Sequence, residues 1–121
     1  MTSDICSRLI DSTWRRYGGD LRNVPQTEGI YTIGVRKAGN IRYLYVGHSL
    51  NIHRRLLQHK RQNLKIDKFL KKQFAKNHGN DLRIKWVLAK KSKRKEGAYI
   101  NCMEEKLGYR LKYNIKRGNG K

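Results

Sequence analysis

Two short runs rich in β-branched and aromatic residues, close together in the chain, constrain its fold most strongly. They extend from Ile30 to Val35 and from Ile41 to Val46, with Arg36-Lys37-Ala38-Gly39-Asn40 between them. Glycine and asparagine adopt positive φ more readily than other residues, so the Gly-Asn pair suits a tight turn. The pattern predicts an antiparallel β-hairpin.

Behind the hairpin, the spacing of apolar residues changes from the period of a strand to that of a helix. A later run of seven residues alternates and then becomes fully apolar, which is typical of a strand. The elements predicted after the hairpin are, in order, a helix capped by Ser49 or Asn51, a helix over Ile66–Lys76, a strand over Leu82–Leu88, a basic loop over Ala89–Lys95 and a helix over Glu96–Leu107.

The chain before the hairpin carries apolar residues at helical spacing between Ser3 and Tyr17, and Gly18-Gly19 follows. We therefore expect residues 1–24 to form an N-terminal helix and a connecting loop, and residues 25–121 to form one domain with a short basic C-terminal tail. A hairpin, a third strand and several helices predict an α+β fold, in which helices flank a three-stranded antiparallel sheet.

The charge of the chain is strongly unbalanced. Twenty-nine Lys and Arg residues against nine Asp and Glu give a formal net charge of +20. Such an excess opposes compaction through self-repulsion and favours a polyanionic partner. Nucleic acid is the expected partner, because each neutralised phosphate releases counterions. A membrane is not expected: the sequence has neither a long basic amphipathic helix with an apolar face nor an apolar run of about 18 residues.

The two cysteines, Cys6 and Cys102, lie far apart in the sequence. Their spacing matches neither a disulfide framework nor a set of zinc ligands. We expect two buried, reduced thiols and an intracellular location, since the N-terminus also lacks the apolar segment of a secretory signal.

Residues suited to phosphate chemistry follow one another along the predicted elements. Gly29-Ile30-Tyr31 opens the first hairpin strand and Tyr45-Val46-Gly47 closes the second, so strand pairing brings the two tyrosines near each other. Arg55 and His59 are four residues apart on the next helix and therefore share one helix face. Each tripeptide alone is ordinary strand sequence, and the information lies in their order.

With Glu104 on the last helix and Asn114 behind it, the stretch from about Pro25 to Asn114 resembles a small, standalone GIY-YIG nuclease domain. His59 is similar to a variant found in restriction-type and homing members. The segment from Tyr31 to Tyr45 is slightly longer than usual in that family, and the spacing from Glu104 to Asn114 is slightly shorter. The resemblance implies a GIY-YIG-like fold and a metal-dependent DNA endonuclease, and it rests on Gly29-Ile30-Tyr31, Tyr45-Val46-Gly47, Arg55, Glu104 and Asn114.

The resemblance also implies a role for each side chain. One carboxylate, Glu104, would hold a single Mg²⁺ or Mn²⁺ ion that keeps most of its waters, with Glu96 and Glu105 as alternatives. Arg55 would donate hydrogen bonds to the phosphate as charge develops. Tyr31 or Tyr45 would accept the proton of the attacking water, His59 would accept a proton or bind phosphate, and Asn114 would brace a loop. No small-molecule cofactor is expected.

Pairs and triplets of basic residues are predicted to bind the DNA backbone, and such contacts position a protein without reading sequence. The endonuclease is expected to select DNA structure or a short site; its biological role and oligomeric state stay open. The alternatives are a basic module that binds DNA or RNA without cutting it, and a ribosome-associated protein. The predicted backbone-binding residues are Lys60, Arg61, Lys71, Lys72, Lys90, Lys91, Lys93, Arg94 and Lys95.

Overall fold

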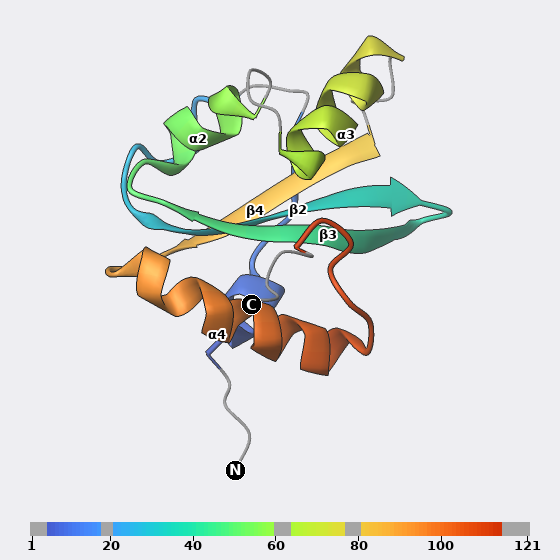
Figure 1. The fold of residues 1–121 in the computed structure, drawn as a ribbon. Coiled ribbons are helices and arrows are strands. Elements are labelled where there is room, and N and C mark those ends of the chain that lie inside the picture. The colour runs from blue at the N-terminus through green and yellow to red at the C-terminus, as the bar shows by residue number, and fades with distance from the viewer. Residues whose placement is uncertain (1–4, 18–20, 60–63, 77–80, 115–121) are drawn as a thin grey trace.

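A computed structural model describes residues 5–17, 21–59, 64–76 and 81–114. The fold is α+β: an antiparallel sheet of four strands, in the order β1-β4-β2-β3, with helices on both faces. Figure 1 shows α2 and α3 on one face and α1 and α4 on the other. The elements are α1 (Ser7–Asp11), β1 (Arg15–Arg16), β2 (Gly29–Lys37), β3 (Asn40–Ser49), α2 (Ile52–Gln58), α3 (Lys65–Ala75), β4 (Leu82–Leu88) and α4 (Ser92–Leu107).

The predicted hairpin is confirmed by the antiparallel pairing of β2 with β3. Its turn lies one residue earlier than Gly39-Asn40, because Ala38 and Gly39 have φ values of 52° and 83° and Lys37 pairs with Asn40. Two central residues with positive φ match the twist of the flanking strands. The third predicted strand is also confirmed: β4 pairs antiparallel with β2 and places Ile84 opposite Ile33.

The prediction of a helix from Ser3 to Tyr17 is confirmed only for Ser7–Asp11. Ser3 lies outside the described residues, Ile5 and Cys6 form a turn, and the chain after Asp11 is not helical. The helix closes where the Ser12 hydroxyl donates to the carbonyl of Leu9. The chain then becomes extended, and β1 adds a fourth strand to the expected three, with Arg15 opposite Ile84. The free backbone edge of β4 offers hydrogen bonds that a longer helix would leave unmade.

The last helix begins at Ser92, one turn before the predicted start at Glu96. Glu28, just before β2, accepts hydrogen bonds from the Ser92 N–H at 2.8 Å and the Ser92 hydroxyl at 2.9 Å. A carboxylate that caps the first N–H groups stabilises a helix at this end. Lys93, Arg94 and Lys95 therefore belong to the first turn of α4 and not to a loop.

A β-bulge in β3 decides which side chains face which helices. Ile33 pairs with Tyr45 but Gly34 pairs with Tyr43, so Leu44 is an extra residue in β3. Side chains two apart on a regular strand share a face. Because of the extra residue, Tyr43 and Tyr45 lie on opposite faces although they are two apart. Tyr43 packs in the core beneath α1 and α4, and Tyr45 packs against the core beneath α2 and α3.

Each face of the sheet has its own apolar core. The α2/α3 face buries residues from both helices and from β2 and β4, among them Ile33, Leu56 and Leu70. The α1/α4 face buries Leu9, Ile30 and Met103. The N-terminal segment contributes to both cores, through Leu9 on one side and Tyr17 on the other.

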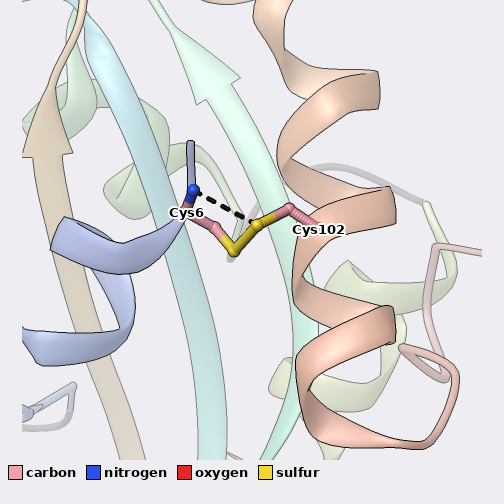
Figure 2. Close-up of a disulfide and its surroundings, with 2 residues drawn as sticks. All are labelled: Cys6 and Cys102. Atoms are coloured by element: carbon pink, nitrogen blue, oxygen red, sulfur yellow. Dashed lines mark hydrogen bonds between the residues drawn. A yellow bond between two sulfur atoms is a disulfide. The ribbon is translucent and has the colours of Figure 1, made fainter. Parts of the chain in front are cut away.

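The expectation of two reduced thiols is wrong in this structure, because Cys6 and Cys102 form a disulfide (Figure 2). The packing of α1 against α4 brings their Cα atoms to 5.9 Å, within the usual range for a disulfide. The backbone N–H of Cys6 also donates to Sγ of Cys102 at 3.3 Å. A separation of 96 residues gave no local signal of this pairing.

Across the described ranges, no helix combines the length and the apolar character needed to cross a membrane.

Candidate active site

Tyr31 of β2 and Tyr45 of β3 lie side by side on the α2/α3 face, with ring centroids 6.1 Å apart. Tyr31 is completely buried, whereas Tyr45 is partly exposed. A Cβ atom on Gly47 would lie 2.6 Å from the Tyr31 hydroxyl, closer than non-bonded atoms approach. Glycine at position 47 therefore makes room for the Tyr31 phenol.

Helix α2 brings Arg55 and His59 to these tyrosines. The helix begins directly behind β3, where the Asn51 side chain accepts the backbone N–H of Arg54 at 2.9 Å, which confirms Asn51 as the cap. The buried imidazole of His59 lies with Nε2 2.7 Å from the Tyr31 hydroxyl. Arg55 lies close enough to both phenols for its charge to act on the pKa of Tyr31 and of Tyr45. The structure thus gathers all four of these predicted residues.

Asp67 of α3 completes a chain of buried polar groups, and the sequence analysis missed it. One carboxylate oxygen, Oδ1, is hydrogen-bonded to Nδ1 of His59, and Oδ2 accepts the backbone N–H of Leu64 at 3.0 Å. An acid three residues behind the start of a helix is a familiar capping arrangement, and this was the available signal. Because a carboxylate only accepts hydrogen bonds, His59 carries its proton on Nδ1 and its Nε2 accepts the proton of Tyr31.

Burial controls the protonation of these groups. Burial, followed by the neighbouring charge of Arg55, lowers the pKa of His59 to about 4, although contact with Asp67 opposes the shift. The imidazole is therefore neutral at pH 7. Burial, followed by the neighbouring Tyr45, raises the pKa of Tyr31 well above its usual value. Burial and then Glu96 raise the pKa of Tyr45, while the charge of Arg55 and the neighbouring Tyr31 act in the opposite direction. Neither phenol is ionised at neutral pH.

The carboxylate that lies beside the tyrosines is Glu96 and not Glu104. Glu96, in the second turn of α4, lines a cleft together with Tyr45, and Oε2 of Glu96 is 2.8 Å from Nδ1 of His48. Glu104 is two turns further along α4, where Oε2 accepts the backbone N–H of Leu111 at 2.8 Å and holds the chain that follows the helix. Glu105 is exposed on α4. We call the hollow lined by Tyr45, Lys65, Glu96, Tyr113 and Asn114 the Tyr45–Glu96 cleft.

Asn114 braces the rim of this cleft. Its side-chain oxygen accepts the N–H of Val46, and its side-chain nitrogen donates to the carbonyl of Val46, each at 2.8 Å. The amide therefore satisfies backbone groups of β3, the strand at one edge of the sheet. This agrees with the predicted bracing role.

The predicted DNA-binding lysines and arginines fall into separate groups. Lys60 and Arg61 lie outside the described residues. Lys71 and Lys72 are on α3, and Lys72 is exposed. The others surround the start of α4, next to Glu96, and most of them are exposed: Lys90, Lys91, Lys93, Arg94 and Lys95.

The Tyr45–Glu96 cleft fits a divalent ion that has one protein ligand. Glu96 retains 26% side-chain exposure, so its carboxylate can reach an ion in the cleft. A Mg²⁺ ion commonly binds through one or two carboxylates and keeps several waters. Within residues 5–17, 21–59, 64–76 and 81–114, no three His, Cys, Asp or Glu side chains cluster into a larger ligand set.

Comparisons with protein-family models, curated proteins and solved structures returned no match to this chain.

Proposed function

We propose that this protein is a divalent-metal-dependent endonuclease that hydrolyses phosphodiester bonds in DNA. The observation that carries the proposal is the buried hydrogen-bonded chain from Tyr31 through His59 to Asp67, whose Tyr31 end lies beside the partly exposed Tyr45 of the cleft. A buried chain of this kind, open at one end to a cleft, is suited to remove a proton from a water molecule. The resemblance to GIY-YIG nucleases supports the same activity and a GIY-YIG-like arrangement of the sheet and helices.

The proton moves inward from the cleft. The attacking water gives its proton to the Tyr45 oxygen while Tyr45 passes its own proton to Tyr31, and Tyr31 passes its proton to Nε2 of His59. The transfers are concerted, because the raised pKa values of both phenols disfavour a free phenolate. The resulting imidazolium is stabilised by Asp67, as in other base–carboxylate pairs. The water oxygen forms the new bond to phosphorus, the bond to the leaving oxygen breaks, and that oxygen takes up a proton from solvent water.

Arg55 and the surrounding charge stabilise the developing negative charge. The guanidinium lies near Tyr45, whose pKa its charge lowers, and we place it within reach of a phosphate in the same cleft. Its planar fork of donors matches the non-bridging oxygens. Glu96 would hold a Mg²⁺ or Mn²⁺ ion, which would supply a Lewis acid for the phosphate oxygens. The formal net charge of +20 favours the approach of DNA.

Cleavage of DNA by the purified protein tests this proposal. Supercoiled plasmid and labelled duplex, flap, junction and single-stranded DNA are incubated with Mg²⁺, Mn²⁺ or a chelator. We expect cuts with either ion and none in chelator. The matched variants are Arg55→Ala and Arg54→Ala, which remove neighbouring arginines of α2, of which Arg54 is exposed.

Arg55→Ala is expected to lower the cleavage rate by about 10²- to 10³-fold, while Arg54→Ala stays within a few fold of wild type. A protein that binds every substrate and cuts none with either ion is a non-cleaving nucleic-acid-binding module. Equal loss in both variants would show that the arginines act through general charge alone.

A further inference from the structure

The outer face of α3 carries a stripe of exposed lysines that begins at the candidate active site and extends beyond it. The spacings of three and four residues place these lysines on one side of the helix, over a length of about 16 Å. The acidic residue of this helix, Asp67, is buried beneath it and bonded to His59. The exposed face is therefore cationic, and the stripe consists of Lys65, Lys68, Lys72 and, at the C-cap, Lys76.

Two aromatic rings lie beside this stripe. Phe69 of α3 and Tyr113 have centroids 5.0 Å apart with a tilt of 34° between the rings. Both are partly exposed, and both line a groove with Lys68 and Lys72. They also line a second groove toward β3, and Nζ of Lys112 lies 5.5 Å from the centroid of the Tyr113 ring. Aromatic surface is thus framed by lysines on two sides.

This surface is continuous with the candidate active site. Lys65 and Tyr113 line the groove along α3 and also line the Tyr45–Glu96 cleft. A strand whose phosphate lies beside Tyr45 can therefore continue along α3. We call this surface the α3 track and define it as Lys65, Lys68, Lys72, Lys76, Phe69 and Tyr113.

The combination of residues favours a single strand over a duplex. Lysines alone would suit the phosphates of either form. Aromatic rings, however, gain from stacking on bases only when the faces of the bases are free, and bases inside a duplex already stack on one another. Lysine-framed aromatic rings are the usual composition of a surface that binds single-stranded nucleic acid without reading its sequence.

We propose that the α3 track binds an unpaired DNA strand that extends from the phosphate to be cut. This inference rests on the proposed endonuclease function and names its substrate class: DNA with a single-stranded arm or gap next to the scissile bond. Blunt duplex would engage the basic start of α4 and other charged surface, but not the aromatic part of the track.

Binding in chelator tests the track separately from cleavage. Fluorescence anisotropy is measured with a labelled 12-nucleotide DNA strand, a blunt duplex, a duplex with a single-stranded arm, and an RNA strand of the same sequence. Tyr113→Leu removes the aromatic face at similar bulk and keeps the backbone N–H that donates to Leu44. Lys68→Gln/Lys72→Gln removes two exposed lysines of the track, and Lys93→Gln/Arg94→Gln removes the same charge from α4.

Tyr113→Leu is expected to weaken single-strand and armed-duplex binding by about 5-fold to 100-fold, with blunt-duplex binding changed less than 2-fold. Lys68→Gln/Lys72→Gln should lower the salt dependence of single-strand binding by about 1.4 in log–log slope. Lys93→Gln/Arg94→Gln should weaken the binding of all the DNA substrates by a similar factor.

The proposal would be overturned if the track variants weakened the binding of blunt duplex and of duplex with a single-stranded arm equally. The track would then act only as nonspecific positive charge. Tighter binding of the RNA strand than of the DNA strand would overturn the commitment to DNA. These readouts do not depend on catalysis: a protein that binds armed DNA through the track but never cuts it would refute the endonuclease and leave the binding site standing.

Discussion

The two faces of the sheet bury polar groups in different ways. On the α1/α4 face, Lys85 is buried, but its Nζ donates to the Ile10 carbonyl and the Tyr43 hydroxyl, so its contacts join the N-terminal segment to the sheet. The disulfide on the same face also joins α1 to α4. On the α2/α3 face, the buried groups Tyr31, His59 and Asp67 form a hydrogen-bonded chain whose Tyr31 end lies beside the partly exposed phenol of Tyr45.

The difference indicates a division of work within one small domain. Polar contacts on the α1/α4 face connect segments distant in sequence and end within the protein. The chain on the α2/α3 face leads to the Tyr45–Glu96 cleft and contains groups of unlike proton affinity, which is the arrangement expected of a functional site. Changes to the α2/α3 face should therefore affect cleavage, and changes to the α1/α4 face should affect stability.

The largest effect is expected for His59→Gln. Without the imidazole the proton chain has no acceptor, and the single-turnover cleavage rate should fall by about 10²- to 10⁴-fold. His53→Gln, a change to a half-buried histidine of the same helix, serves as the control and should cleave like wild type. Parallel losses in the two variants would mean that a disturbed α2, and not a lost base, explains the effect.

Removal of the disulfide should produce the opposite pattern. Cys6→Ala/Cys102→Ala opens a loop of 96 residues, and we expect the free energy of unfolding to fall by about 3–4 kcal/mol. Urea denaturation of the variant, and of wild type with and without reductant, measures this. The cleavage rate at a temperature where the variant is folded should stay within 2-fold of wild type. A strongly reduced rate in a fully folded variant would contradict the division between the faces.

Asp67→Asn tests whether the carboxylate positions His59. The amide can donate a hydrogen bond to Nδ1, which moves the imidazole proton to Nε2 and removes the acceptor for Tyr31. We expect kcat to fall by about 10²-fold with little change in KM. The matched change Asp81→Asn alters a half-exposed carboxylate paired with Arg36 and should leave kcat unchanged. A change in KM alone would assign Asp67 to DNA binding.

The smallest effect concerns pH. The pKa of His59 is about 4 in the folded protein and about 6.5 when unfolded. Between these values the unfolded chain binds more protons, so the free energy of unfolding should decrease as pH falls from 6.5 toward 4. Urea denaturation across this range should show a flatter slope for His59→Gln than for wild type or His53→Gln. Identical slopes in all three proteins would show that His59 does not hold a lowered pKa.

Elements with a clear period could be predicted from the sequence, and those set by distant partners could not. Leu82–Leu88 and the hairpin carry their own alternation, so the sheet could be found without coordinates. Arg15-Arg16 is too short to show a period, and its strand character comes from pairing with Ile84 and Arg83. The early start of α4 depends in the same way on Glu28, which is remote in sequence.

The residues of the candidate site also fall into two groups: those placed by local sequence patterns and those placed by tertiary packing. Tyr31, Tyr45, Arg55 and His59 could be grouped because hairpin pairing and one helix turn fix their relative positions. Glu104 was favoured over Glu96 from the sequence, because the glutamate that lies beside Tyr45 depends on how α4 crosses β3, which no local pattern shows. That crossing places Glu96 beside Tyr45 and uses Glu104 to hold Leu111. Asp67 was missed because contact with His59 requires α2 and α3 to pack together.

The proposal that Glu96 holds the metal ion is tested most directly by comparing Glu96→Gln with Glu104→Gln. Single-turnover cleavage of a duplex with a single-stranded arm is measured for both variants across a Mg²⁺ titration. We predict that Glu96→Gln lowers the rate by about 10²-fold or more and raises the Mg²⁺ concentration needed for half-maximal rate. Glu104→Gln should keep the wild-type Mg²⁺ dependence, with at most a small loss of stability. Full activity in Glu96→Gln together with loss of cleavage in a folded Glu104→Gln would contradict the assignment of Glu96 as the metal ligand.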